Sequence, residues 1–348
     1  MRRYDIDWIR VIAIGLLIIY HSAIAFQPWG SMIGFPTSKE SWTALWMPMA
    51  ILNVWRIPLL FFVSGMGVYF AMQSRTWTQL LGERSRRIMI PYLFGMLVIV
   101  PIQVSIWRMK PMYVINPAHL WFLGNIMAYV VIFFPLFYYL KNKNIISRIF
   151  ASPFSILIPM IFLMAEKWII NPLPYELYAM TLHGFFLGLI AFFFGFCFAC
   201  AGEPFFKTIS KMRWILLAAA AVLGYLRLGN NVQSLIPIES VSWILFIFSI
   251  GYQYLNKPGK ALSYLSEAAY PVYVLHMMFQ FLFSIMIFQL DIPVPIKFVL
   301  LVILTLAGSI ATFQLIKQTN ITRFLFGLKP THPRTYAPTH SEPRPLQP

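Results

Sequence analysis

The feature that most constrains this chain is a succession of apolar stretches. An apolar stretch of roughly 17–25 residues crosses the hydrocarbon core of a bilayer as one helix. Ten such stretches can be placed, at residues 8–27, 44–72, 88–107, 119–140, 149–165, 180–201, 213–228, 239–256, 269–290 and 294–316. We therefore predict an all-α polytopic membrane protein, with about ten transmembrane helices in contact with the lipid bilayer.

The distribution of charge supports a membrane protein over a nucleic-acid-binding one. Charged residues make up 11% of the chain, whereas a soluble domain contains about 25%. The net charge of +16 would also suit a nucleic-acid-binding protein, but the basic residues lie in short clusters between the apolar stretches. Such clusters are typical of cytoplasmic loops, so we expect no nucleic-acid partner.

The basic clusters recur in every second loop and so orient the chain. They include Arg2 and Arg3, the cluster at 84–87, Lys141 and Lys143, and Lys257 and Lys260. Because loops rich in Lys and Arg stay in the cytoplasm, we predict that both termini lie there. The transmembrane domain would cover residues 1–328. Residues 329–348 are polar and rich in proline, so we expect a disordered cytoplasmic tail.

The first stretch, YDIDWIRVIAIGLLIIYHS at 4–22, carries Asp7, Arg10 and His21 within its apolar run. On a helix, Arg10 and His21 share one face, about 16 Å apart along the axis, and Asp7 lies beside Arg10. Ionisable groups inside a span cost on the order of 3 kcal/mol each, which makes them candidate functional residues. The alternative is an Asp–Arg pair at the interface and a single buried histidine.

The second stretch contains WRIPLLFFVSGMGVYF at 55–70. Arg56 lies in its outer half, and a buried guanidinium needs a partner. The acidic residue of the first stretch lies too far inside, so we expect a substrate anion or a carboxylate from an outer loop. Ser64 is a candidate substrate-binding residue, and Pro58 is expected to kink the helix. Close helix packing explains Gly65 and Gly67 without a further function.

A cytoplasmic loop, GERSRRIMIPY at 82–92, places Arg84, Arg86 and Arg87 at the mouth of the third stretch. Guanidinium groups bind phosphates well, so the three side chains are a candidate clamp for a nucleotide-bearing donor. Positive-inside anchoring explains the same cluster without a ligand.

Two further histidines have aromatic neighbours in the sequence. His119 and Trp121 open the fourth stretch as HLWFLGN, where an aromatic belt would account for the tryptophan and surface exposure for the histidine. Tyr273 and His276 share a face of the ninth stretch, in AYPVYVLHMMF. Since His21 also lies within a span, His21 and His276 could together transfer a proton near neutral pH. A hydrogen bond from His276 to a neighbouring helix is the alternative.

Other polar or sulfur-containing residues lack a supporting motif. His183, near the outer end of the sixth stretch, is expected to be structural. Cys197 and Cys200 have CxxC spacing but stand in the apolar run FFFGFCFACAG, so we expect them to pack as small side chains. The sequence contains no GxSxG, HExxH or P-loop motif, and we expect no metal.

Taken in order, these elements resemble the acyltransferase 3 family of polytopic membrane enzymes. The family's first-span signature, a basic residue followed after ten positions by a histidine, matches Arg10 and His21. The remaining elements match FFVSG at 61–65, the arginine loop at 84–87 with Pro91, HLWFL at 119–123, and Tyr273 with His276. The DxxR before His21, Arg56 before FFVSG, and RFLFGLKP at 323–330 are most similar to the glucan biosynthesis protein C branch.

The resemblance implies an O-acyltransferase in the bacterial cytoplasmic (inner) membrane. It would move an acetyl or succinyl group from cytoplasmic acyl-CoA, the donor substrate, to a hydroxyl of an extracytoplasmic glycan, with no bound cofactor. His21 would act as general base or carry the acyl group transiently, and Arg10, His276 and Tyr273 would complete the catalytic site. The expected substrate-binding residues are Asp7, Arg56, Ser64, Arg84, Arg86, Arg87, His119 and Trp121.

Two other functions remain open on the sequence. In a transporter or channel for a small anionic or glycan-related substrate, the same charged residues would line the path of the substrate. A non-catalytic partner in a glycan-export complex would need no reactive site.

Overall fold

The computed structural model describes residues 3–230 and 232–330, and these residues form helices and no strand. Nine helical spans in this part of the chain are long and apolar enough to cross a membrane. The number is ten if α10 (Glu203–Lys211) and α11 (Arg213–Asn230), which meet at 62°, form one bent span. The predicted all-α polytopic fold is confirmed. Of the predicted tail, residues 331–348 lie outside the described residues.

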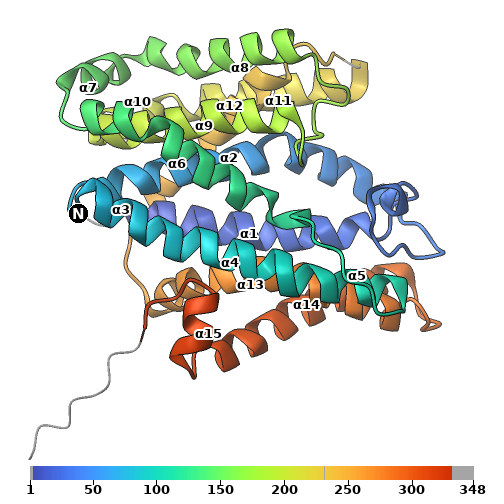
Figure 1. Ribbon diagram of the computed structural model, residues 1–348. Coiled ribbons are helices and arrows are strands. Elements are labelled where there is room, and N and C mark those ends of the chain that lie inside the picture. Colours follow the sequence, from blue (N-terminus) through green and yellow to red (C-terminus); the bar gives the residue numbers. More distant parts are fainter. Residues whose placement is uncertain (1–2, 231, 331–348) are drawn as a thin grey trace, which may run out of the picture.

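The remaining helices pack into one bundle (Figure 1). They are α1 (Tyr4–Ile24), α2 (Trp46–Met72), α3 (Trp77–Arg84), α4 (Ile90–Phe94), α5 (Val100–Arg108), α6 (Trp121–Leu140), α7 (Asn144–Ala151), α8 (Leu157–Ile170), α9 (Leu182–Ala201), α12 (Ile236–Ile250), α13 (Lys260–Ile287), α14 (Val294–Ile316) and α15 (Asn320–Leu325). Two π-helical segments, η3 (Ser85–Met89) and η4 (Gly95–Ile99), join α3, α4 and α5 into one span.

The two ends of the bundle differ in their basic loops. We define the basic end as the end where α1 begins, which also holds the loops with Arg84, Lys141 and Lys257, and the distal end as the other (Figure 1). The helix α13 begins at Lys260, earlier than the predicted 269, because its polar first turns extend beyond the apolar run.

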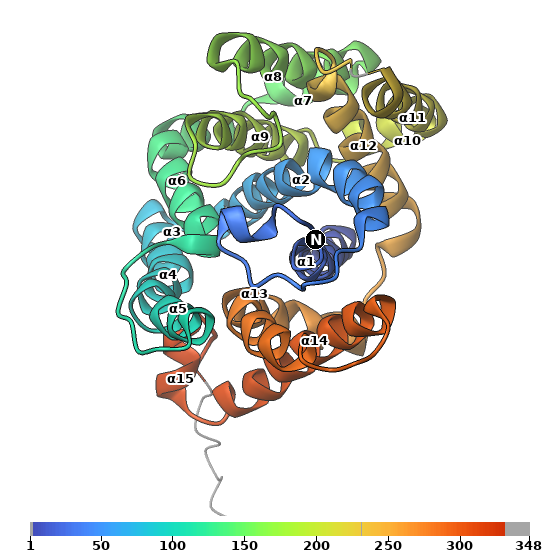
Figure 2. The ribbon, with the colours of Figure 1, turned by 90° about the vertical axis from the view of Figure 1, so that its right-hand side faces the viewer.

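Helix α1 occupies the middle of the bundle. Figure 2 shows it inside a ring of helices, with α2 on one side and α13 and α14 on the opposite side. The predicted polar face of α1 is therefore surrounded by other helices, although the Arg10 side chain keeps 42% of its surface accessible.

Helices α2 and α9 pack with their backbones in close contact. A methyl group built on Gly65 would lie 1.9 Å from the carbonyl oxygen of Phe192, and one on Gly195 would lie 2.0 Å from that of Phe62. Only glycine fits at these two crossing points. Gly65 thus has the packing role expected for it. Gly67 does not, because a methyl group there would meet nothing within 4 Å.

Candidate active site

The histidines predicted within spans α1 and α13 meet in the interior of the bundle. His21 Nδ1 lies 2.9 Å from His276 Nε2, and the two imidazole rings stack with their centroids 5.2 Å apart. His276 is fully buried, whereas His21 keeps part of its surface accessible. Two residues that are far apart in sequence therefore form one hydrogen-bonded pair.

The backbone fixes the tautomers of this pair when both rings are neutral. His276 Nδ1 lies 2.6 Å from the carbonyl oxygen of Tyr273, which can only accept, so this nitrogen carries the hydrogen. The Nε2 of His276 then accepts a hydrogen bond from His21 Nδ1. The Nε2 of His21 is left with a lone pair, as a general base requires.

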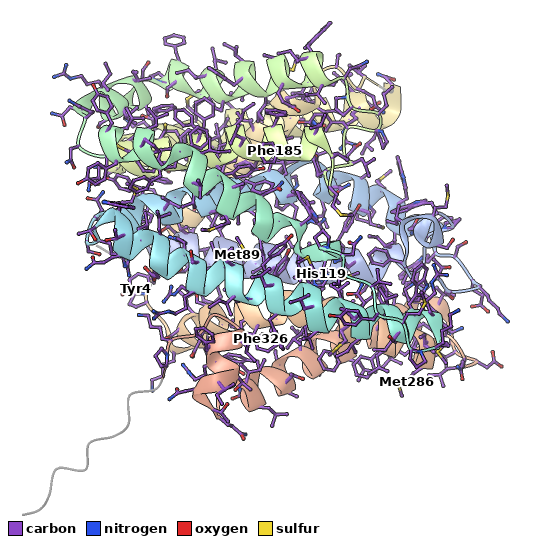
Figure 3. The ribbon with its side chains drawn as sticks, in the orientation of Figure 1. Tyr4, Met89, His119, Phe185, Met286 and Phe326 are labelled. Carbon is purple, nitrogen blue, oxygen red and sulfur yellow. The ribbon has the colours of Figure 1, made fainter. Side chains whose placement is uncertain are left out.

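His119, at the turn into α6 (Figure 3), joins the pair. Its ring centroid lies 5.1 Å from that of His276, and its Nε2 lies 3.1 Å from the carbonyl oxygen of Val274. Tyr273 Oη donates a 2.5 Å hydrogen bond to the His119 carbonyl. The alternative of surface exposure for His119 is therefore wrong. Because Nε2 donates to a carbonyl, Nδ1 bears a lone pair, and it is buried with no hydrogen-bond partner among the described residues.

Trp121 is buried beneath these histidines. It packs edge-on against Phe61, with ring centroids 6.0 Å apart, and keeps 9% of its surface exposed. The aromatic-belt explanation is wrong for this residue, because a belt tryptophan faces the lipid headgroups.

Arg56 is a buried cation beside the imidazoles. It is 1% exposed, its guanidinium lies 3.9 Å from the centre of the Tyr20 ring, and its Nη2 lies 3.5 Å from Asn53 Oδ1. Within 3–230 and 232–330, its Nε and Nη1 have no hydrogen-bond partner and no carboxylate forms an ion pair with it.

The expected carboxylate from an outer loop is therefore wrong for Arg56. Glu176, which lies in the distal α8–α9 loop, instead approaches Arg227 at 3.6 Å. The guanidinium of Arg56 retains two buried nitrogens, Nε and Nη1, for which the described residues supply no anion. Of the two partners predicted for Arg56, the substrate anion therefore stays a prediction.

Two more cations lie nearer the basic end. Arg10 Nη2 forms a 3.0 Å ion pair with Asp7, as the spacing predicted. Arg84 points into the bundle, where its Nη2 donates to the carbonyl oxygen of Gly67 at 2.9 Å and its Nε has no partner within the described chain. Arg84 also lies within electrostatic range of Arg10. Arg10 and Arg84 together form a positive region on the basic side of the histidines.

The loop predicted at 82–92 is wrong, because these residues belong to the continuous helical span Trp77–Arg108. Arg87 stays within electrostatic range of Arg84 but is paired with Glu83, and Arg86 faces a different cavity, so the three arginines do not form one clamp. Arg87 Nε lies 3.2 Å from Glu83 Oε1. Arg86 is exposed and lines a cavity of about 210 Å³ with Asn320 and Phe324, at α15. The physical reason is helical geometry, since neighbouring side chains on a helix leave in different directions.

Ser64 lies one turn before Gly67 on α2. Its Oγ donates to the Leu60 carbonyl oxygen of the same helix at 2.7 Å, and part of its surface is accessible. A substrate contact would have to use the second lone pair of this hydroxyl.

The α1–α2 loop, residues 25–45, covers the distal side of the site. Phe35 packs edge-on against His21, with ring centroids 5.7 Å apart. The loop is held by a backbone hydrogen bond from Ser38 to Ala25 and by an ion pair of 3.7 Å between Glu40 and Lys297 of α14. Access to His21 from the distal end therefore depends on this loop.

Two buried pairs of ionisable residues at the distal end were not predicted from the sequence. His183 Nδ1 lies 2.8 Å from Glu166, and Arg227 forms a two-fold contact with Glu239 at 2.7 and 3.0 Å. In each pair the residues lie near the facing ends of two successive helices, and this placement was the available signal. His183, expected to be structural, has an ionisable partner that was not foreseen.

The comparisons with known proteins are consistent with the site. The family model described as an acyltransferase domain, Acyl_transf_3, matches residues 3–314. No curated protein and no solved structure matched the chain. The matched residues include every helix described around the histidines, and the fold is that of a multi-pass membrane protein. The chain belongs to the acyltransferase 3 family and is a membrane acyltransferase.

Proposed function

We propose that the protein transfers an acetyl or succinyl group from acyl-CoA on the cytoplasmic side to a hydroxyl of an extracytoplasmic glycan. The observation that supports this most directly is the pairing of His21 with His276 next to Arg56. A base with a free lone pair and a cation with free N–H groups are the two elements that acyl transfer to a hydroxyl needs.

The chemical step follows from these positions. His21 Nε2 accepts the proton of the glycan hydroxyl while the oxygen attacks the thioester carbonyl carbon. The N–H groups of Arg56 stabilise the oxyanion that forms. When the carbon–sulfur bond breaks, the CoA thiolate takes the proton from the His21 imidazolium, which leaves an O-ester and free thiol. In the alternative route, His21 Nε2 attacks the thioester carbonyl carbon and the carbon–sulfur bond breaks, so that CoA leaves as the thiolate. The glycan hydroxyl then attacks the acyl-imidazole, the carbon–nitrogen bond breaks, and the hydroxyl proton passes to the thiolate, which again leaves an O-ester, free thiol and neutral His21.

His276 supports His21 in either route. Its Nε2 holds the His21 ring by the 2.9 Å hydrogen bond and partly stabilises the positive charge that develops on it. The carbonyl oxygen of Tyr273 fixes the orientation of His276 in turn. His119 Nδ1, a lone pair directed at no described group, would accept an N–H of the donor.

The positive charge at the basic end favours binding of the acyl-CoA donor there. The positive region of Arg10 and Arg84 would attract the phosphates of CoA from the cytoplasm, and its extended pantetheine arm would cover the rise of about 16 Å from Arg10 to His21. The exposed Arg86 and the paired Arg87 would add long-range attraction only. The bacterial inner membrane is the expected location, since acyl-CoA is cytoplasmic.

The test uses the purified full-length protein in vesicles. Labelled acetyl-CoA or succinyl-CoA is supplied to the basic end, and a glucan oligosaccharide to the distal end. The wild type is expected to form acylated glycan, and His21→Ala to lose at least about 100-fold in rate, as general-base removal predicts. External imidazole should restore part of the rate of this variant. Equal folding of the two proteins is checked by size-exclusion profile and circular dichroism.

The outcomes separate the alternatives. Unchanged transfer by His21→Ala would remove His21 from the mechanism. If the wild type transfers no acyl group from either donor but moves an anion or glycan across the vesicle membrane, the proposal gives way to transport. Labelled protein isolated by rapid desalting at neutral pH, where an acyl-imidazole survives longer than in acid, would favour the route through acyl-histidine if it forms in the wild type and not in His21→Ala.

A further inference from the structure

The distal half of α2 contains a carbonyl group that its own helix cannot bond. In an α-helix, the carbonyl of residue 54 accepts from the N–H of residue 58. Residue 58 is Pro58, inside α2, and proline has no N–H. The Val54 carbonyl is therefore free within the helix, in a segment where Val54 itself is fully buried. A buried free carbonyl needs another donor.

Two hydroxyl groups from other elements fill this need. Ser240 Oγ, near the start of α12, donates to the Val54 carbonyl oxygen at 2.8 Å. Tyr178 Oη, in the distal α8–α9 loop, donates to the same oxygen at 3.4 Å. Burial raises the pKa of Tyr178 well above its ordinary value, and nearby Tyr175 and Glu176 add to the shift, so the hydroxyl keeps its proton. We call Ser240 and Tyr178 the carbonyl clamp.

The same turn of α2 is held at two more points. Arg227 Nη2 donates to the Ala50 carbonyl oxygen at 3.3 Å, and Asn53 Nδ2 donates to the Glu176 carbonyl oxygen at 3.5 Å. Arg227 is itself fixed by Glu239, which belongs to α12 like Ser240. Residues 50–54 of α2 are thus attached to α11, α12 and the α8–α9 loop by polar contacts.

Arg56 lies between this attached turn and Pro58. The direction of its side chain depends on how α2 bends at the proline, because the bend rotates the segment that carries it. The Arg56 guanidinium also contacts Asn53 within the attached turn. We propose that Ser240 and Tyr178 are positioning residues, which hold the free Val54 carbonyl and thereby direct the Arg56 guanidinium to the imidazole pair. The catalytic side of this inference rests on the proposed function.

The first experiment compares Ser240→Ala and Tyr178→Phe with the wild type in acyl transfer. Each variant is expected to lower kcat about 3- to 10-fold, the effect of one buried hydrogen bond, with KM for the acyl donor within about twofold. The matched control is Ser242→Ala on the same helix, whose buried hydroxyl has no hydrogen-bond partner in the described part of the chain. This control is expected to keep the wild-type kcat.

The decisive experiment introduces the missing N–H. In Pro58→Ala, residue 58 can donate to the Val54 carbonyl, so the clamp is no longer needed. Pro58→Ala is expected to lower kcat by itself, because it changes the bend of α2 that directs Arg56. Adding Ser240→Ala to Pro58→Ala should then change kcat by less than about twofold. If Ser240→Ala lowers kcat by the same factor in both backgrounds, the clamp does not act through the Val54 carbonyl and the proposal is wrong.

A readout without acyl transfer separates this proposal from the proposed function. The intact protein in detergent is treated with an arginine-selective dicarbonyl reagent. Mass spectrometry then measures the rate at which Arg56 is modified. This rate is expected to rise about 3- to 10-fold in Ser240→Ala and Tyr178→Phe, and not in Ser242→Ala. The same rise in a protein that transfers no acyl group would refute the function and support the positioning role. Unchanged rates in both clamp variants would refute the positioning role.

Discussion

Arg56 and Arg227 are two buried arginines in the distal half of the same bundle, and they differ in what neutralises them. Arg227 contacts Glu239 through two nitrogens at 2.7 and 3.0 Å and approaches Glu176 at 3.6 Å. Arg56 has the face of Tyr20 and the side chain of Asn53, with two guanidinium nitrogens unpaired within the described residues. From this difference we expect Arg227 to stabilise the fold, and we propose that Arg56 binds a substrate group.

The largest effect is expected at Arg227. Replacing it by Gln leaves Glu239 buried without its counter-charge, which is expected to cost about 3–5 kcal/mol of stability. The double variant Arg227→Met/Glu239→Leu should recover most of this loss, because it removes both charges. The measurement is the thermal unfolding midpoint in detergent. If Arg227→Gln keeps the wild-type unfolding midpoint, Arg227 does not stabilise the fold and does not differ from Arg56 in this respect.

Arg56→Gln is expected to affect kcat strongly and stability little, the opposite of Arg227→Gln. Removing an unpaired buried cation leaves stability unchanged or raised, while the loss of oxyanion stabilisation lowers kcat by about 100- to 1000-fold. The rate of acyl transfer and the unfolding midpoint are measured on the same preparation. A large drop in stability would show that Arg56 is held by partners of its own, as Arg227 is.

A comparison of two acyl donors distinguishes which group Arg56 binds. If Arg56 stabilises the oxyanion, acetyl-CoA and succinyl-CoA lose rate by the same factor in Arg56→Gln. If it binds the free carboxylate of a dicarboxylic acyl group, the loss with succinyl-CoA exceeds that with acetyl-CoA. Ser242→Ala is the matched comparison and should leave the ratio of the two rates unchanged.

The smallest effect is expected at Tyr20, which lies under the Arg56 guanidinium. Tyr20→Leu removes the cation–π contact, worth about 1–2 kcal/mol in a desolvated site, and should lower kcat about fivefold or more. Tyr20→Phe keeps the aromatic face and should stay within about twofold. Equal rates for the two variants would mean that the ring face does not hold Arg56.

Local features of the fold and site followed from the sequence. Span lengths and the spacing of Asp7 and Arg10 are set within one helix, and the structure contains both. The histidine pair was anticipated only as a possibility, because residues 21 and 276 are brought together by the packing of α1 against α13. The directions of Arg84, Arg86 and Arg87 depend on the helical span that contains them and on the neighbour that each side chain reaches, whereas the sequence predicted a loop there.

The close contact of α2 with α9 has a mechanical consequence. Where backbones touch at Gly65 and Gly195, neither helix can slide past the other without a collision. The part of α2 that follows Pro58 is therefore fixed against α9, while the turn next to Arg56 is held by its own polar contacts. The distal covering of the site is attached differently, by the ion pair of Glu40, whose side chain is 63% exposed, with Lys297. Movements that admit a glycan to His21 should accordingly occur in residues 25–45, while α2 keeps its place.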